Sequence, residues 1–197
     1  MIKFKTVMAA VLAALLALTT VVPVQAARIY NPDTNTWEDA STVATRSRRG
    51  SAIKKEIVDY ETKYKVGTII VETSERRLYF VLADGKAIKY GIGVGREGFT
   101  WAGTNRISRT AEWPSWTPPA AMRKRVPDLP AYMPGGPNNP LGARALYIGS
   151  TLYRIHGTSE PWTIGQAVSS GCIRMTNEDV IDLYERVKVG ATVVVRQ

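Results

Sequence analysis

Hydrophobic and aromatic residues recur in short segments from about Lys65 onward. Thr68–Glu72 (TIIVE) and Arg77–Leu82 (RLYFVL) are rich in β-branched and aromatic residues, which favours strands. The second segment runs into Asp84-Gly85, a dipeptide typical of a tight hairpin, and a further strand is expected over Ala87–Val94. This pattern predicts a β-meander and therefore a mainly β domain.

Two more short strands are expected near the C-terminus. Ala145–Ile148 and Tyr153–His156 are apolar segments on either side of the turn Gly149-Ser150. Because side chains alternate along a strand, Arg154 and His156 should lie on one face of the second segment. His156 would then stand at the end of a strand.

A helix is expected directly after Met175. Thr176 can cap it, and acidic residues in the first turn complement the helix dipole. Gly190 ends the helical pattern, and Ala191–Val195 predicts a last strand. The expected apolar face of the helix consists of Val180, Ile181, Tyr184 and Val187.

A stretch rich in proline, glycine and tryptophan separates these groups of strands, over residues 95–142. It includes EWPSWTPPAAM and MPGGPNNPLG, and proline cannot donate a ladder hydrogen bond. We therefore expect an ordered loop without regular strands. Long ordered loops often form lids or binding walls, so Trp113, Trp116 and Tyr132 either line a groove or only pack against the domain.

The first 26 residues have the pattern of a secretory signal peptide. Lys3 and Lys5 precede an apolar run over residues 7–18, and Val24-Gln25-Ala26 matches a small-x-small cleavage site. The run is shorter than the roughly 20 residues of a membrane-spanning helix. Cleavage after Ala26 is therefore favoured over an uncleaved anchor, with no membrane span left afterwards, and no cysteine near the site indicates a lipid anchor.

Residues 27–64 form a predicted N-terminal extension, and residues 65–197 the predicted main domain. The extension is polar, contains a basic cluster over residues 46–49 and has no sustained periodicity. Tyr30 and Trp37 are its candidates for docking onto the domain. The segment is accordingly either a tether or a part of the folded domain.

The charge of the chain indicates an affinity for anionic polymers. The formal net charge is +9, and loss of Lys3 and Lys5 with the signal peptide would leave +7. An exported basic protein is attracted to cell-wall glycans or lipid headgroups, although the charge can equally serve solubility. No nucleic-acid-binding motif accompanies it, so nucleic acid is not expected as a partner.

The candidate chemistry lies in the segment HGTSEPWTIGQAVSSGCIRM. It holds the only histidine, His156, and the only cysteine, Cys172, of the chain. A lone cysteine in an oxidising compartment is a buried inert residue, half of an intermolecular bridge, or a reactive thiol. A thiol becomes nucleophilic as its thiolate, and an imidazole can take the proton. One histidine and one cysteine fall short of the protein ligands that zinc needs, so no metal is expected.

The residues that flank Cys172 suit acyl transfer. The small residues Ser169, Ser170 and Gly171 allow backbone amides to converge in front of the sulfur, where they can form an oxyanion hole. Arg174 can stabilise a thiolate or hold a substrate carboxylate; the alternative is a surface ion pair.

The segments HGT and SSGCIRMTNEDV, with His156 and Cys172 separated by 16 positions, resemble the active-site signature of the L,D-transpeptidase catalytic domain (YkuD-type) family. The resemblance extends over roughly Val66 to Arg196 and includes IIVETSERRLYFVLADGKAIKYGIGVG and NNPLGARALYIGS. It implies a mainly β catalytic domain with a β-sandwich core, long Pro/Gly/Trp-rich loops and a short helix after the cysteine.

The resemblance also implies an exported, periplasmic enzyme of the cell wall. Such enzymes attack the bond between diaminopimelate and the terminal D-alanine of a peptidoglycan tetrapeptide stem and form a thioester. An amine then takes the acyl group, from a second stem peptide, an outer-membrane protein or a free D-amino acid. No cofactor is required, and carbapenems are expected to acylate the thiol.

The site residues follow by position from this resemblance. Cys172 would be the nucleophile, His156 the general base, and the backbone amides of Gly171 and Cys172 the oxyanion hole. The residues implied in substrate binding are Arg174, Ser170, Gly157, Thr158 and Tyr153.

Ser170 departs from the family pattern. The usual motif is Ser-His-Gly-Cys, and Ser170 stands where a second histidine is common. A serine hydroxyl can still donate or accept a hydrogen bond, so activity is expected, with an altered pH dependence or acceptor choice. Two alternatives stay open: an L,D-carboxypeptidase in which water resolves the thioester, and a non-catalytic module that binds peptidoglycan.

Overall fold

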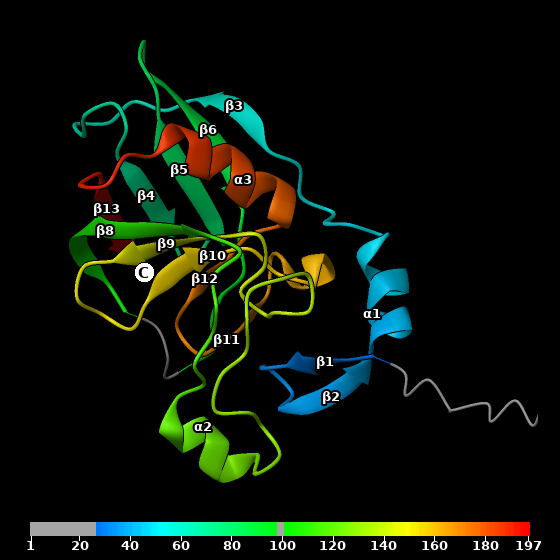
Figure 1. Cartoon of the computed structure of the whole chain (residues 1–197). Coiled ribbons are helices and arrows are strands. Elements are labelled where there is room, and N and C mark those ends of the chain that lie inside the picture. The colour runs from blue at the N-terminus through cyan, green and yellow to red at the C-terminus, as the bar shows by residue number, and fades with distance from the viewer. Residues whose placement is uncertain (1–26, 98–100) are drawn as a thin grey trace, which may run out of the picture.

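The computed structural model describes residues 27–97 and 101–197, so the predicted signal peptide lies outside the described residues. These residues form a mainly β protein, as predicted (Figure 1). None of the helices in the described ranges is long and apolar enough to cross a membrane. The strands are β1 (Arg28–Asn31), β2 (Thr36–Asp39), β3 (Glu56–Asp59), β4 (Ile69–Glu72), β5 (Arg77–Val81), β6 (Lys86–Gly91), β7 (Val94–Gly95), β8 (Gly103–Glu112), β9 (Arg144–Ile148), β10 (Arg154–His156), β11 (Ala167–Ser169), β12 (Ile173–Arg174) and β13 (Thr192–Arg196); the helices are α1 (Ala40–Ser47), α2 (Ala120–Arg125), the 3-10 turn η1 (Pro161–Thr163) and α3 (Asn177–Arg186).

Nine strands form one mixed sheet in the order β12-β10-β9-β8-β13-β4-β5-β6-β3. Most neighbours are antiparallel, whereas β13 pairs with β4 and β10 pairs with β12 in parallel. Parallel strands need a long connection. Strands β4 and β13 lie near opposite ends of the domain sequence, and η1 and β11 lie between β10 and β12. The second of these pairs supports the candidate site at one edge of the sheet.

The main hydrophobic core unites both halves of this sheet. It takes alternate residues of β4 and β5, such as Ile69 and Leu78, together with Leu146 of β9 and Leu183 of α3. The opposite face of β4 and β5 is also buried, against residues 58–64. Because strands covered on both faces need apolar residues at every position, TIIVE and RLYFVL appear as continuous apolar runs.

The local sequence signals predicted several elements correctly. Asp84 and Gly85 have φ values of 57° and 65°, as a type I′ hairpin turn requires, and join β5 to β6. The side chain of Thr176 caps α3 by accepting a hydrogen bond from the amide of Asp179. Of the predicted apolar face, Val180 and Val187 are buried and Ile181 and Tyr184 are half-buried; Leu183, which is also buried, was not predicted.

The prediction of a strand-free loop over residues 95–142 was wrong. Gly103–Glu112 forms the ten-residue strand β8, paired with β9 on one side and β13 on the other. The prolines of this stretch begin at Pro114, so they leave β8 free to pair. Its sequence is polar because most of its side chains are exposed or half-buried; Ile107 alone in this strand is buried. The stretch also contains the helix α2.

The predicted extension is folded against the rest of the chain. Strands β1 and β2 form a hairpin, α1 follows, and β3 pairs with β6 at the edge of the large sheet. Tyr30 lies edge-on to Trp37, with ring centroids 5.5 Å apart, and stacks on Trp116 at 5.9 Å. Tyr30 therefore joins the hairpin to the Pro-rich segment around α2. A domain boundary near residue 65 stays a prediction.

Candidate functional site

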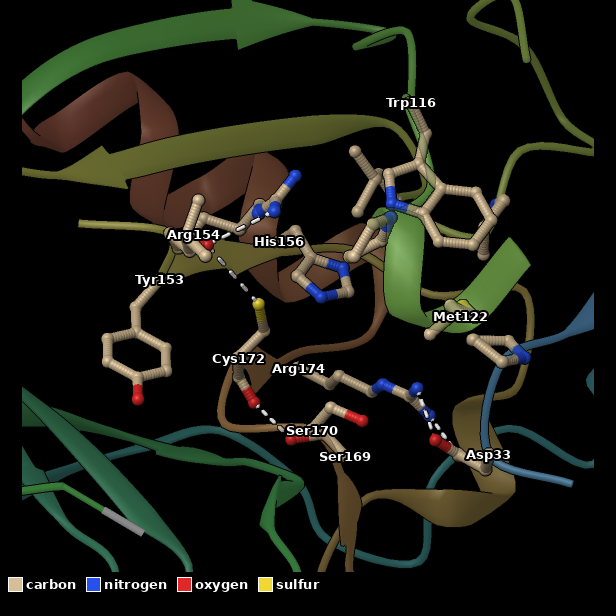
Figure 2. Close-up of a pocket in the computed structure, with 15 residues that line it drawn as sticks. Asp33, Trp116, Met122, Tyr153, Arg154, His156, Ser169, Ser170, Cys172 and Arg174 are labelled. Carbon is tan, nitrogen blue, oxygen red and sulfur yellow. Dashed lines mark hydrogen bonds and ion pairs between the residues drawn. The ribbon is translucent and has the colours of Figure 1, made fainter. Parts of the chain in front are cut away.

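The parallel pairing of β10 with β12 brings the predicted catalytic residues together. In this register His156 is the partner of Arg174. Cys172 directly precedes β12, and its thiol and Nη2 of Arg154 both lie at the Leu152 carbonyl oxygen, at 4.0 and 3.1 Å. Side chains two positions apart on a strand share a face, and paired residues of neighbouring strands point the same way. The four side chains consequently form a two-by-two array, which Figure 2 shows around one cavity.

The loop before Cys172 is fixed by backbone pairing. Strand β11 pairs with β7, and Gly93 exchanges two 2.9 Å backbone hydrogen bonds with Arg174. Gly171 has a φ of 102°, a left-handed conformation that glycine adopts without strain, and it turns the chain from β11 into β12. The spacing of 16 residues between histidine and cysteine thus accommodates η1, β11 and this turn.

Cys172 is a free, half-buried cysteine, and both its thiol and its backbone carbonyl make hydrogen-bond contacts. Its thiol lies 4.0 Å from the Leu152 carbonyl oxygen, to which it can donate a weak hydrogen bond. Ser169 donates from its hydroxyl to the carbonyl of Cys172 at 2.6 Å and accepts from the amide of Gly171 at 3.2 Å. The Gly171 amide could donate to an oxyanion only after it released its hydrogen bond to the Ser169 hydroxyl.

Trp101 adds a contact that sequence reasoning did not identify. Its indole Nε1 donates to the carbonyl of Gly171 at 3.1 Å. Its ring stacks on Tyr153 with centroids 4.8 Å apart and planes 7° apart. Trp101 therefore connects the turn before Cys172 to Tyr153, the residue that precedes β10.

His156 is buried, with 4% of its surface exposed. Its Nδ1 lies 2.6 Å from the Gly157 carbonyl, which can only accept, so Nδ1 carries the proton and Nε2 has the free lone pair. Burial, together with the charges of Arg174 and Arg154, lowers the pKa of His156 to about 3. The imidazole is therefore neutral near pH 7 and can accept a proton where a negative charge forms beside it. Figure 2 shows the ring and the Cys172 sulfur facing the same part of the cavity.

Arg174 is buried, and the alternative of a surface ion pair was wrong. It makes a bidentate ion pair with Asp33, in which Nη2 donates to Oδ1 at 2.6 Å and Nη1 donates to Oδ2. Glu160 lies 3.6 Å from Nη1 on another side. Asp33 comes from the β1–β2 hairpin and is 141 residues away in the chain, so no local sequence pattern could have identified it.

Glu160 is the second acid of this buried network. Asn31 of β1 donates from Nδ2 to its carboxylate at 2.6 Å. Burial raises the pKa of Glu160 to about 7, while Arg174 lowers it and Asp33 raises it. Two residues of the hairpin thus contact this network: Asn31 binds Glu160, and Asp33 binds Arg174.

The cavity in front of this array has a volume of about 390 Å³. Of the predicted substrate-binding residues, Ser170, Tyr153 and Arg174 line it, whereas Gly157 and Thr158 are buried beside it. Trp116 lines it and also packs on Tyr30, but Trp113 and Tyr132 do not line it. Its full lining is Pro32, Asp33, Trp116, Pro119, Met122, Pro140, Leu141, Leu152, Tyr153, Arg154, His156, Ser169, Ser170, Cys172 and Arg174.

No group of three or more metal-ligating His, Cys, Asp or Glu side chains occurs within residues 27–97 and 101–197. The structure brings the predicted nucleophile and base to one cavity; the role of each site residue stays a prediction.

Comparison with known proteins identifies similar chains. Residues 67–195 match the family model described as the L,D-transpeptidase catalytic domain (YkuD). The chain is 42% identical over 134 residues to a probable L,D-transpeptidase ErfK/SrfK of Escherichia coli K12, a match covering 64% of this chain. The chain spans only 42% of the length of that relative.

Two solved structures extend the comparison. A Brucella melitensis protein, described as a probable carnitine operon oxidoreductase caia, is 43% identical, with a TM-score of 0.51 over 78% of this chain and 99% of that chain. L,D-transpeptidase 3 of Mycobacterium tuberculosis has a TM-score of 0.52 over 67% of this chain and 61% of that chain. Its identity is 17%, so the second similarity shows a shared fold alone.

Proposed function

Since the chain belongs to the L,D-transpeptidase catalytic domain (YkuD) family, we propose that it is an exported cysteine acyltransferase of the peptidoglycan layer. Its donor substrate is a tetrapeptide stem, cleaved between diaminopimelate and D-alanine. The observation that carries this proposal is that His156, at the end of β10, and Cys172, directly before β12, line one cavity.

Acylation begins with proton transfer from the thiol of Cys172 to Nε2 of His156. The sulfur attacks the carbonyl carbon of diaminopimelate, and backbone amides near the sulfur stabilise the oxyanion. Collapse of this intermediate breaks the C–N bond, and the imidazolium returns its proton to the D-alanine amine. The product is a thioester, and no redox step or cofactor takes part.

The buried, neutral His156 suits this sequence of proton transfers. Its low pKa makes protonation costly in the resting site, but the thiolate that forms in the same step provides the compensating charge. The proton is then returned readily to the leaving amine. The low pKa therefore favours short-lived protonation over a stable thiolate–imidazolium pair.

The second half-reaction transfers the acyl group to an amine. The proposed acceptor is the side-chain amine of a second stem peptide, which gives a 3-3 cross-link; an outer-membrane protein or a free D-amino acid would react by the same chemistry. These reactions place the mature protein in the periplasm.

The proposal is tested by incubating the mature protein with tetrapeptide-rich muropeptides and analysing the products by mass spectrometry. Cross-linked dimers or exchanged D-amino acids are expected, and Cys172→Ala should abolish them. His156→Ala should slow acylation strongly while the circular dichroism spectrum is retained. Shortened monomers alone would instead identify an L,D-carboxypeptidase. Binding to sacculi without any product or thiol adduct would identify a non-catalytic module.

A further inference from the structure

We propose that Arg154 binds the terminal carboxylate of the donor stem and so selects stems that end in D-alanine at the fourth position. This inference rests on the proposed function. It reverses the expectation that Arg174 holds a substrate carboxylate, because the two arginines of the array differ in what already surrounds them.

The positive charge of Arg174 is already neutralised. Its side chain is 5% exposed, and both terminal nitrogens donate to the carboxylate of Asp33. Glu160 adds a second carboxylate at 3.6 Å. A substrate carboxylate at this position would meet two fixed acids, and Asp33 itself lines the cavity beside the guanidinium. Arg174 therefore serves as a fixed part of the cavity wall.

Arg154 lines the same cavity, and no carboxylate of residues 27–97 or 101–197 pairs with it. Within the described residues its contacts are a hydrogen bond from Nη2 to the Leu152 carbonyl at 3.1 Å and a cation–π contact with Tyr147 at 5.8 Å. Its Nε is buried and has no hydrogen-bond partner. The Nε of Arg174 is buried in the same way, so the two arginines differ in their terminal nitrogens. Nη2 of Arg154 meets only a backbone carbonyl, which leaves the positive charge available to a substrate carboxylate.

The position of Arg154 matches the position of the terminal carboxylate in the bound stem. Nη2 of Arg154 and the thiol of Cys172 both lie at the Leu152 carbonyl oxygen, at 3.1 and 4.0 Å, and neighbouring strands are about 4.8 Å apart. In a tetrapeptide stem the D-alanine carboxylate lies one residue, about 3.8 Å, beyond the scissile carbonyl. A guanidinium next to the nucleophile can therefore reach this group while the sulfur reaches the carbonyl. In a pentapeptide stem an amide would occupy the same place.

The test compares binding of two ligands to protein that cannot react. Isothermal titration calorimetry measures Kd of the Cys172→Ala protein for a synthetic tetrapeptide stem and for the same peptide with a C-terminal carboxamide. The acid should bind roughly tenfold or more tightly than the amide, as expected for a charge-assisted hydrogen bond. In the Cys172→Ala/Arg154→Gln protein this preference should disappear, and Arg154→Lys should retain part of it.

Arg109→Gln is the matched control. Arg109 also contacts the ring of Tyr147, at 3.6 Å, but it does not line the cavity. The Arg109→Gln substitution removes the same unit of positive charge as Arg154→Gln, and it should leave the preference for the acid peptide unchanged. If the Cys172→Ala/Arg154→Gln protein still preferred the acid to the amide, the role of Arg154 would be refuted while the proposed function would stand. Failure of the Cys172→Ala protein to bind either peptide would overturn the proposed function together with it.

Discussion

The ion pair between Asp33 and Arg174 predicts that the β1–β2 hairpin stabilises the cavity of the candidate site. Replacing Asp33 by alanine leaves the guanidinium of Arg174, 5% exposed, with Glu160 at 3.6 Å as its remaining acid. Breaking a buried ion pair by removing one partner costs about 3–5 kcal/mol. Since Glu160 retains part of the attraction, we expect a loss of about 2–3 kcal/mol in the free energy of unfolding.

Urea titration and thermal melting of a protein that comprises residues 27–197 measure this loss. For a domain of this size the melting temperature should fall by roughly 4–10 °C. Asp59→Ala is the control, because Asp59 pairs with Lys86 at 2.7 Å while its side chain is 90% exposed. An exposed pair contributes little, so this variant should melt close to the parent protein. Equal effects of the two substitutions would refute the reasoning that burial makes the Asp33 pair important.

Three further predictions follow. Glu160 has a pKa of about 7 against an ordinary 4.5, so its contribution to folding is present below about pH 4.5 and lost as the pH rises through 7. Glu160→Gln should therefore reduce the loss of unfolding free energy between about pH 5 and pH 8, measured by urea titration at each pH; an unchanged difference would contradict this. Trp101→Phe removes the 3.1 Å hydrogen bond to the Gly171 carbonyl and should slow thiol acylation by a carbapenem roughly two- to tenfold without unfolding the protein; an unchanged rate counts against a positioning role. Gly142→Ala would place a Cβ 2.3 Å from Asn177 Oδ1 and should cost at least about 2 kcal/mol in a urea titration, whereas Gly190→Ala, also at positive φ but in open space, should cost about 1 kcal/mol. The same Cβ would lie 2.6 Å from the carbonyl carbon of Gly157 and 2.7 Å from the amide nitrogen of Thr158, so equal costs for the two variants would contradict this prediction.

The elements that the sequence predicted have local causes. The turn at Asp84-Gly85 depends on two residues that tolerate positive φ, and the cap of α3 depends on Thr176 and an amide three residues later. Strand β8 escaped prediction because its stability comes from β9 and β13, which lie far along the chain. Its own side chains are largely polar, so the apolar alternation that marks other strands is missing.

The candidate site was predicted in part for the same reason. His156 and Cys172 stood out because each is unique in the chain, and their spacing matched a family pattern. The buried acids around Arg174 could not be predicted, since Asp33 belongs to a hairpin that no periodicity distinguishes from a polar tail. The different surroundings of Arg154 and Arg174 depend on this tertiary contact and become visible only in the folded chain.

The most direct measurement of the central claim is the intact mass of the mature protein during turnover of a tetrapeptide stem. If Cys172 carries the acyl group, a species heavier by the stem without its D-alanine should form, disappear on addition of hydroxylamine, and be absent from Cys172→Ala. Turnover that continues in Cys172→Ala, or an adduct that maps to another residue, would contradict the account.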